Sequence, residues 1–193
     1  MDNFTKSKID KFFEKYPPRE YKKGDLIIVP EKLPEGVFCL VSGTVRTYAL
    51  SKNGLELTLN IFKPVSFFSM LWFMNGKDKY YYEALKDVVV RIALKAEFEG
   101  FFRNEPDIVY DLLSRIYRGL PGYMMRMEAL LGGGAYISVI TNLLIQARRF
   151  GDGRDKNIFL NLTHSQLSSL SGLTRETVTR EIKKLQDKKI VGY

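Results

Sequence analysis

The sequence predicts an α+β protein with a strand-rich N-terminal domain, one long helix and a C-terminal helix-turn-helix. Short apolar runs separated by turn residues fill the N-terminal half, a long helical pattern covers residues 106–131, and two short capped helices flank a glycine within residues 162–190. We therefore expect domains at residues 1–105 and 132–193, joined by a helix at residues 106–131.

The N-terminal domain should begin with a short helix at residues 5–16, which Pro17 and Pro18 end. Strands are expected at residues 26–29, 36–41, 44–50, 55–62 and 88–93. Asn53-Gly54 lies between two of these runs and predicts a tight primed hairpin turn, because such turns need positive φ at their central positions.

The middle helix carries apolar side chains at alternating steps of four and three residues. They are Val109, Leu113, Ile116, Leu120, Tyr123, Met127 and Leu130, and we call them the seam. This heptad pattern favours a coiled coil between two copies of the chain, and the alternative is a helix packed on its own N-terminal domain. Because a proline removes a helical hydrogen bond, Pro121-Gly122 predicts a kink or two helices end to end.

The C-terminal domain begins with glycines at residues 132–134, whose wide φ/ψ freedom predicts a hinge. Residues 136–149 then show the apolar spacing of a supporting helix. Thr163 and Gln166 form a Thr-x-x-Gln capping box, and Gly172 should end the helix that they start. Thr174 can cap the next helix, so this region predicts two helices about a glycine turn.

The last helix has an apolar stripe and a polar face. Val178, Ile182 and Leu185 recur at helical spacing and must face a core. The polar face holds Arg175, Glu176, Thr179, Arg180 and Lys183. A DNA-reading helix needs this division, but an ordinary surface amphipathic helix has it too.

Residues 174–180, reading TRETVTR, resemble the recognition helix of the CRP/FNR family of bacterial transcription regulators. The order of Gly24-Asp25 and then Gly36 to Gly43 is similar to the family's sensor domain. The resemblance implies an N-terminal β-roll of cyclic-nucleotide-binding type, a dimerisation helix and a winged helix-turn-helix. It covers nearly the whole chain and is strongest in the last thirty or so residues.

The resemblance implies that Arg175, Glu176 and Arg180 read base edges. Arginine can donate two hydrogen bonds to guanine O6 and N7, and glutamate can accept one from cytosine N4. Candidates for contacts to the DNA backbone are Thr163, Ser165, Thr174, Thr179 and Lys183. The expected partners are an inverted repeat in double-stranded DNA, a second copy of the chain and, as a further candidate, RNA polymerase.

Two departures from the family pattern change the expectations. Phe68-Ser69-Met70 and Asp78-Lys79-Tyr80 stand where the family's nucleotide cassette has Gly-Glu-Leu and Arg-Ser/Thr-Ala, so we expect no response to cyclic AMP and no cofactor, with the effector unknown. The family's β-hairpin wing should follow the recognition helix, yet only residues 190–193 remain, so we expect the wing to be truncated or nearly absent.

Aromatic and apolar side chains crowd the region of the missing cassette. One interpretation is a pocket for an apolar or aromatic effector, and the other is that the rings fill the roll without a ligand or pack against the dimerisation helix. The residues of the candidate pocket are Phe68, Ser69, Met70, Trp72, Tyr80 and Tyr82.

Composition limits the classes of function. The hydrophobic content of 45% excludes global disorder, and the net charge of +8 is concentrated in residues 132–193, which hold 10 basic and 5 acidic side chains, as DNA binding requires. Cys39 is the only cysteine and His164 the only histidine, so neither a disulfide, a four-thiolate cluster nor a metal site is expected.

The same survey argues against catalysis and membrane insertion. The sequence has no glycine-rich phosphate loop and no His-Glu-x-x-His motif, so we expect no enzyme. It also has no signal peptide and no apolar run of membrane-spanning length, so we expect a cytoplasmic protein. The alternative function is a ligand-sensing or partner-controlled β-roll scaffold that acts through protein contacts.

Overall fold

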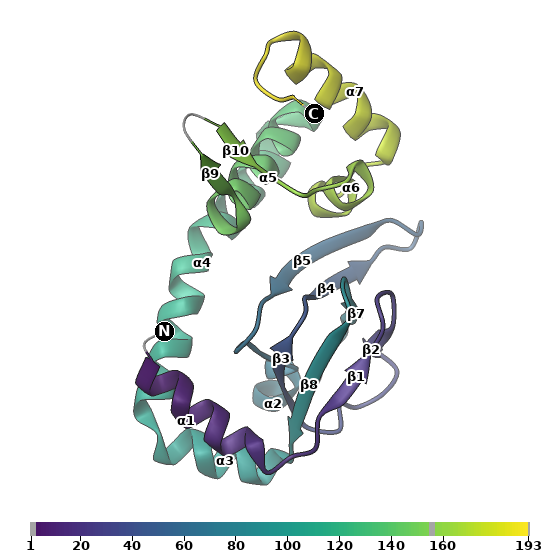
Figure 1. Ribbon diagram of the computed structural model, residues 1–193. Coiled ribbons are helices and arrows are strands. Elements are labelled where there is room, and N and C mark those ends of the chain that lie inside the picture. Colours follow the sequence, from purple (N-terminus) through teal and green to yellow (C-terminus); the bar gives the residue numbers. More distant parts are fainter. Residues whose placement is uncertain (1–2, 155–156, 193) are drawn as a thin grey trace. The chain divides into compact units, whose positions relative to one another are not determined.

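The computed structural model describes residues 3–154 and 157–192, and it divides into two compact units (Figure 1). Unit 1 comprises Met1–Leu50 and Leu59–Ile116, and unit 2 comprises Ser51–Thr58 and Tyr117–Tyr193. The division falls within the long helix rather than at its ends, so the domain boundaries expected from the sequence stay a prediction.

The chain forms two four-stranded sheets, as the α+β prediction requires, and their residues belong to unit 1 except for residues 56–58 of the second sheet. The first has the order β1 (Arg19–Tyr21), β8 (Val88–Ala93), β3 (Val37–Ser42) and β6 (Phe67–Phe68). The second has the order β2 (Leu26–Ile28), β7 (Tyr81–Ala84), β4 (Val45–Leu50) and β5 (Glu56–Phe62). The helices are α1 (Asn3–Glu14), α2 (Met70–Asn75) and α3 (Lys95–Asn104). The five strands expected from the sequence are all present, whereas β1, β6, β7, α2 and α3 were not among the expected elements.

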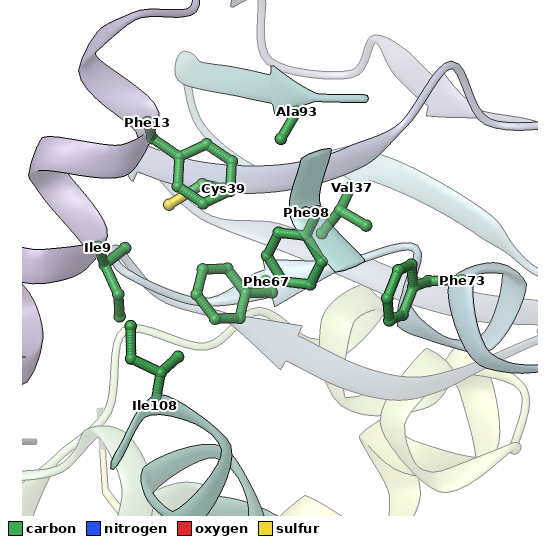
Figure 2. Packing of buried hydrophobic residues seen from close by; sticks show 9 residues of the cluster. All are labelled: Ile9, Phe13, Val37, Cys39, Phe67, Phe73, Ala93, Phe98 and Ile108. Atoms are coloured by element: carbon green, nitrogen blue, oxygen red, sulfur yellow. The ribbon is translucent and has the colours of Figure 1, made fainter. Parts of the chain in front are cut away.

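One hydrophobic core joins α1 and α3 to the first sheet. Phe13, Phe67 and Phe98 are almost fully buried and point toward one another (Figure 2), with ring centroids 5.8 Å apart for Phe13 and Phe67 and 5.3 Å apart for Phe67 and Phe98. Arg91 on β8 donates hydrogen bonds to the carbonyls of Phe13, Glu14 and Tyr16. Because the last carbonyls of a helix have no partner within it, Arg91 stabilises the C-terminus of α1.

A second core fills the space between the two sheets and forms the interior of the roll. We call its buried residues the roll core. They are Ile28, Phe38, Leu40, Val45, Phe68, Tyr82, Ala84, Val88 and Val90. They come from six strands, so the roll core is what fixes the two sheets face to face.

The hairpin between β4 and β5 is present, but the prediction of a tight primed turn at Asn53-Gly54 is wrong. The strands end at Leu50 and resume at Glu56, so residues 51–55 form a wider loop than a two-residue turn. Gly54 has a φ of 79°, while Asn53 does not have positive φ. The loop closes instead through hydrogen bonds from Ser51 N–H to the Leu55 carbonyl and from Gly54 N–H to the Ser51 carbonyl.

The long helix α4 (Pro106–Gly132) continues unbroken past Pro121, so two helices end to end are not observed. Its seam is exposed, from 36% at Val109 to 63% at Met127, whereas Ile108 is fully buried in the first core. Within unit 1, Ile108 is thus packed in the core while Val109, Leu113 and Ile116 of the seam are exposed, so this part of the seam is not packed on the N-terminal domain.

Unit 2 continues with α5 (Gly134–Phe150), β9 (Asp152–Arg154), β10 (Asn157–Phe159), α6 (His164–Ser171) and α7 (Arg175–Asp187). Helices α4 and α5 meet at Gly133, and Gly134 has a φ of 61°, so glycines separate the two helices and the hinge stays a prediction. The β9–β10 hairpin was not predicted. After α7, residues 190–192 form no strand, and residue 193, the last of the expected wing segment, lies outside the described residues.

Among the described residues, no helix is both long and apolar enough to cross a membrane.

Candidate DNA interface

Helix α6 begins and ends as the sequence predicts. The Gln166 N–H donates to Thr163 Oγ1 at 3.2 Å, and the Thr163 N–H donates to Gln166 Oε1 at 2.8 Å, which completes the capping box. At the other end Gly172 adopts a φ of 66° and its N–H donates to the Ser168 carbonyl. Positive φ favours glycine, so Gly172 lets the chain turn directly into α7.

Helix α7 is capped by Thr174, whose Oγ1 accepts the Thr177 N–H at 3.3 Å. Its stripe packs as expected, with Val178 and Leu185 fully buried and Ile182 nearly so. The opposing side chains come from α5 and α6 and include Val139 and Leu167. Because one side of α7 is fixed in this way, its opposite face is presented to solvent.

The three predicted base-reading residues lie on that exposed face. Arg175 and Glu176 occupy the first turn, and Arg180 follows Glu176 by one turn. A hydrogen bond from its own backbone N–H, then one from Thr174, and then the nearby Arg175 charge hold the pKa of Glu176 below its ordinary 4.5. Glu176 is therefore an ionised acceptor at neutral pH, which is the state needed to accept a hydrogen bond from cytosine N4.

The predicted backbone-contacting residues are all exposed: Thr163, Ser165, Thr174, Thr179 and Lys183. The Thr163 and Thr174 hydroxyls already cap helices, and the Thr179 hydroxyl donates to the Arg175 carbonyl at 2.9 Å. These three hydroxyls therefore shape the two helices, whereas Ser165 on α6 and Lys183 on α7 are exposed side chains.

One contact between the two helices was not predicted. His164 Nδ1 lies 3.0 Å from Thr179 Oγ1, and since that hydroxyl donates to Arg175, it accepts from the imidazole. The contact ties the first turn of α6 to the middle of α7. No sequence signal identifies it, because the two residues are 15 positions apart on different helices.

The candidate effector residues are divided between the two cores of unit 1. Phe68 and Tyr82 belong to the roll core, where their rings stack with centroids 5.6 Å apart and Phe38 stacks on Phe68 at 4.9 Å. Tyr80 packs at the edge of the same core, while Met70 and Trp72 pack against the first core. A cavity of about 580 Å³ does lie in unit 1, between α1 and β3, but none of the six candidate residues lines it.

The polar groups of Ser69, Asp78 and Tyr82 form hydrogen bonds within the chain. The Tyr82 hydroxyl donates to Asp78 Oδ2 at 2.7 Å, and the Tyr80 N–H donates to Asp78 Oδ1 at 3.1 Å. Burial, followed by the hydrogen bond to Asp78, raises the pKa of Tyr82, so its phenol stays protonated. Ser69 is fully buried and its hydroxyl donates to the Gly36 carbonyl at 2.8 Å.

These residues do not fit a cyclic nucleotide. An anionic phosphate needs a cation or several N–H donors, whereas Asp78, which the resemblance places at the family's arginine, is a carboxylate that repels an anion. Ser69, which the resemblance places at the ribose-binding glutamate, is turned to the backbone. Lys79 is exposed, with its Nζ 5.8 Å from the ring centroid of Tyr80.

Comparison with known proteins gives matches over both parts of the chain. Residues 18–105 match the model of the cyclic nucleotide-binding domain, and residues 139–192 match that of the Crp-like helix-turn-helix domain. The global nitrogen regulator of Synechococcus elongatus is 26% identical over 180 residues, which cover 90% of this chain and 80% of that protein. The transcriptional regulator SdrP of Thermus thermophilus is 27% identical over 170 residues, which cover 86% and 80%.

The fold also matches solved structures. The c-di-GMP responsive global regulator CLP of Xanthomonas campestris superposes with a TM-score of 0.82 at 18% identity, over 97% of this chain and 95% of that chain. At that identity the match shows the fold alone.

Proposed function

Because the chain belongs to the CRP/FNR family of transcription regulators, we propose that a homodimer of it binds an inverted repeat in double-stranded DNA. Each copy places α7 in the major groove of one half-site, and the half-sites lie about 34 Å apart, one turn of DNA. The observation that carries this proposal is the exposure of Arg175, Glu176 and Arg180 on a helix whose other side is packed on α5 and α6.

Base reading is assigned to Arg175, Glu176 and Arg180 by their chemistry. Two arginines can each donate a pair of hydrogen bonds to a guanine, and Glu176 can accept from cytosine N4. Ser165, Lys183 and the capped helix starts at Thr163 and Thr174 position the helices on the phosphates, because N–H groups at a helix N-terminus attract anions. The hydroxyl of Thr179 contributes by holding α7 to α6 through His164.

Dimer formation is supported by the seam. Its side chains are apolar and exposed in the single chain, and their spacing suits a two-stranded coiled coil. Burial of these side chains against a second copy removes apolar surface from water, which is the dominant favourable contribution to association.

The sensor is proposed to act without cyclic AMP. The stacked rings of Phe68 and Tyr82 and the Asp78 carboxylate support this, because neither offers a site for a ribose and a cyclic phosphate. Control then comes from another effector, from a protein partner or from the amount of the protein. We place the dimer in the cytoplasm, with RNA polymerase as its partner at promoters and with no catalytic activity of its own.

Selection of bound sequences from a pool of random DNA tests the proposal. The purified full chain, with and without cell extract, should enrich an inverted repeat with half-sites one helical turn apart. The scaffold alternative predicts that no motif is enriched in either condition, and that genomic DNA is not retained in a filter-binding assay.

A further inference from the structure

Helix α7 buries a carboxylate in its apolar stripe. Glu181 lies three residues after Val178 and four before Leu185, and it is only 3% exposed. A buried ionised group is destabilising unless it is paired and hydrogen-bonded, so the partners of Glu181 decide how this helix tolerates it.

Both partners of Glu181 come from the polar side of the same helix. Lys184 Nζ lies 2.9 Å from Oε1 and 2.7 Å from Oε2, and Arg180 Nε donates to Oε1 at 3.3 Å. The hydrogen bond from Lys184 is the main cause that holds the pKa of Glu181 below 4.5, so the carboxylate is ionised at neutral pH. The side chains of Arg180 and Lys184 are 67% and 53% exposed, against 4% for Glu181.

This arrangement orients Arg180. A guanidinium donates from Nε on one side and from Nη1 and Nη2 at its end. With Nε held by the buried carboxylate, Nη1 and Nη2 remain as donors on a side chain that is 67% exposed. Guanine O6 and N7 require two donors in a fixed geometry, and a long side chain that is already held loses less conformational freedom on binding.

We propose that Glu181 is a positioning residue that fixes the guanidinium of Arg180 for reading a guanine, an inference that rests on the proposed function. Glu181 also offsets one positive charge close to the DNA. Because phosphate attraction is independent of sequence, this negative charge weakens binding to all DNA while the fixed arginine strengthens binding to the correct site.

The test uses the full-length protein with Glu181→Gln and Glu181→Leu. Glutamine removes the charge at similar size, and leucine fills the apolar stripe, so at least one variant should keep the fold, as thermal unfolding can verify. Dissociation constants are measured for the selected site and for every single base-pair change in one half-site. Discrimination at the base pair read by Arg180 should fall on the order of fivefold or more, while preferences elsewhere stay within about twofold. Affinity for unrelated DNA should rise.

Two further variants separate positioning from a general structural effect. Lys184→Met removes the other partner of Glu181 and should leave the base preference in place, since Arg180 is still held. In an Arg180→Ala background, Glu181→Gln should produce no additional change in base preference, because the residue through which it acts is gone.

Two outcomes would overturn the inference, and they are distinguishable from each other. If the wild-type chain selects a motif but Glu181→Gln weakens all sites equally or leaves every preference unchanged, Glu181 has no positioning role and the proposed function stands. If the wild-type chain selects no motif, the proposed function fails and the role of Glu181 fails with it.

Discussion

Helix α7 and the interior of the roll differ in the surroundings they give to the residues that the sequence predicts to bind ligands. On α7 the side chains at those positions are charged and exposed, and the apolar stripe behind them is buried. In the roll, Phe68, Ser69 and Tyr82 are buried and bonded to their own chain. The side chains predicted to read DNA are therefore accessible to a ligand, whereas Phe68, Ser69 and Tyr82 are enclosed in the interior of the protein.

The contrast has a simple physical basis. A side chain that reads DNA must keep its donors in water until DNA replaces the water, so it remains exposed. A buried polar group must find a partner within the protein, and Tyr82 and Ser69 have done so with Asp78 and Gly36. A ligand entering the roll would have to break these hydrogen bonds and separate stacked rings.

Replacing Phe68 in the roll core should have the greatest effect on the stability of the protein. Phe68→Ala should lower the free energy of unfolding by about 3–5 kcal/mol, because it leaves a cavity between Phe38 and Tyr82. Denaturant unfolding measures it, with Leu33→Ala, which is 75% exposed, as a control expected to change little. A loss below about 1 kcal/mol would mean that the ring does not support the roll and that the site is open.

The next effect concerns the seam, through which we propose that two copies of the chain associate. Leu120→Glu puts charges into an apolar contact and should convert the dimer to monomers in sedimentation experiments. Affinity for the inverted repeat should fall about 100-fold, because the second half-site is no longer bound by a linked partner. Tyr110→Glu, at a 74% exposed position outside the seam, should have little effect. Equal losses in both variants would rule out the coiled coil.

A smaller effect should distinguish a side chain of α7 that contacts bases from one that contacts the phosphate backbone. Arg180→Ala should cost about 1–3 kcal/mol of binding free energy and relax the preference at one base pair of each half-site. Lys183→Ala should instead weaken all sequences alike and reduce the salt dependence of binding by about one phosphate contact. Quantitative binding to a set of single base-pair variants checks both. Identical behaviour of the two variants would remove the distinction between their roles.

The sequence predicted the helix-turn-helix better than the interior of the roll. Capping residues, a glycine stop and an apolar stripe act within a few residues of one another, so Thr163, Gly172, Thr174 and Val178 could all be interpreted from spacing. The burial of Glu181 was not predicted, because a glutamate next to an apolar stripe is ordinarily expected to be exposed. The contact between His164 and Thr179 was not predicted, because it depends on how two helices pack.

In the roll, the arrangement of the aromatic side chains could not be predicted, for a different reason. Aromatic side chains at residues 67–82 fit both a ligand pocket and a packed core, since both are apolar. Only the three-dimensional arrangement shows that Phe68 and Tyr82 stack on each other while Trp72 belongs to a different core. Short elements such as β6 and α2 were missed for a related reason, because segments of this length have too few residues for a periodic pattern.

The smallest expected effect concerns the start of α6. Thr163→Ala removes the side-chain oxygen that accepts the Gln166 N–H and should cost about 1 kcal/mol of stability. Thr163→Ser keeps that oxygen and serves as the matched control. Thermal unfolding of both variants provides the comparison, and an alanine variant as stable as the serine variant would show that the cap contributes nothing.

The most direct test of an accessible DNA-reading surface and a closed roll is one titration of the selected DNA site with the purified chain, with and without saturating cyclic AMP. We predict a dissociation constant on the order of 10⁻⁸ M or tighter at physiological salt, far below that for unrelated DNA and unchanged by the nucleotide. Non-specific binding alone, converted to specific binding when cyclic AMP is added, would contradict the account.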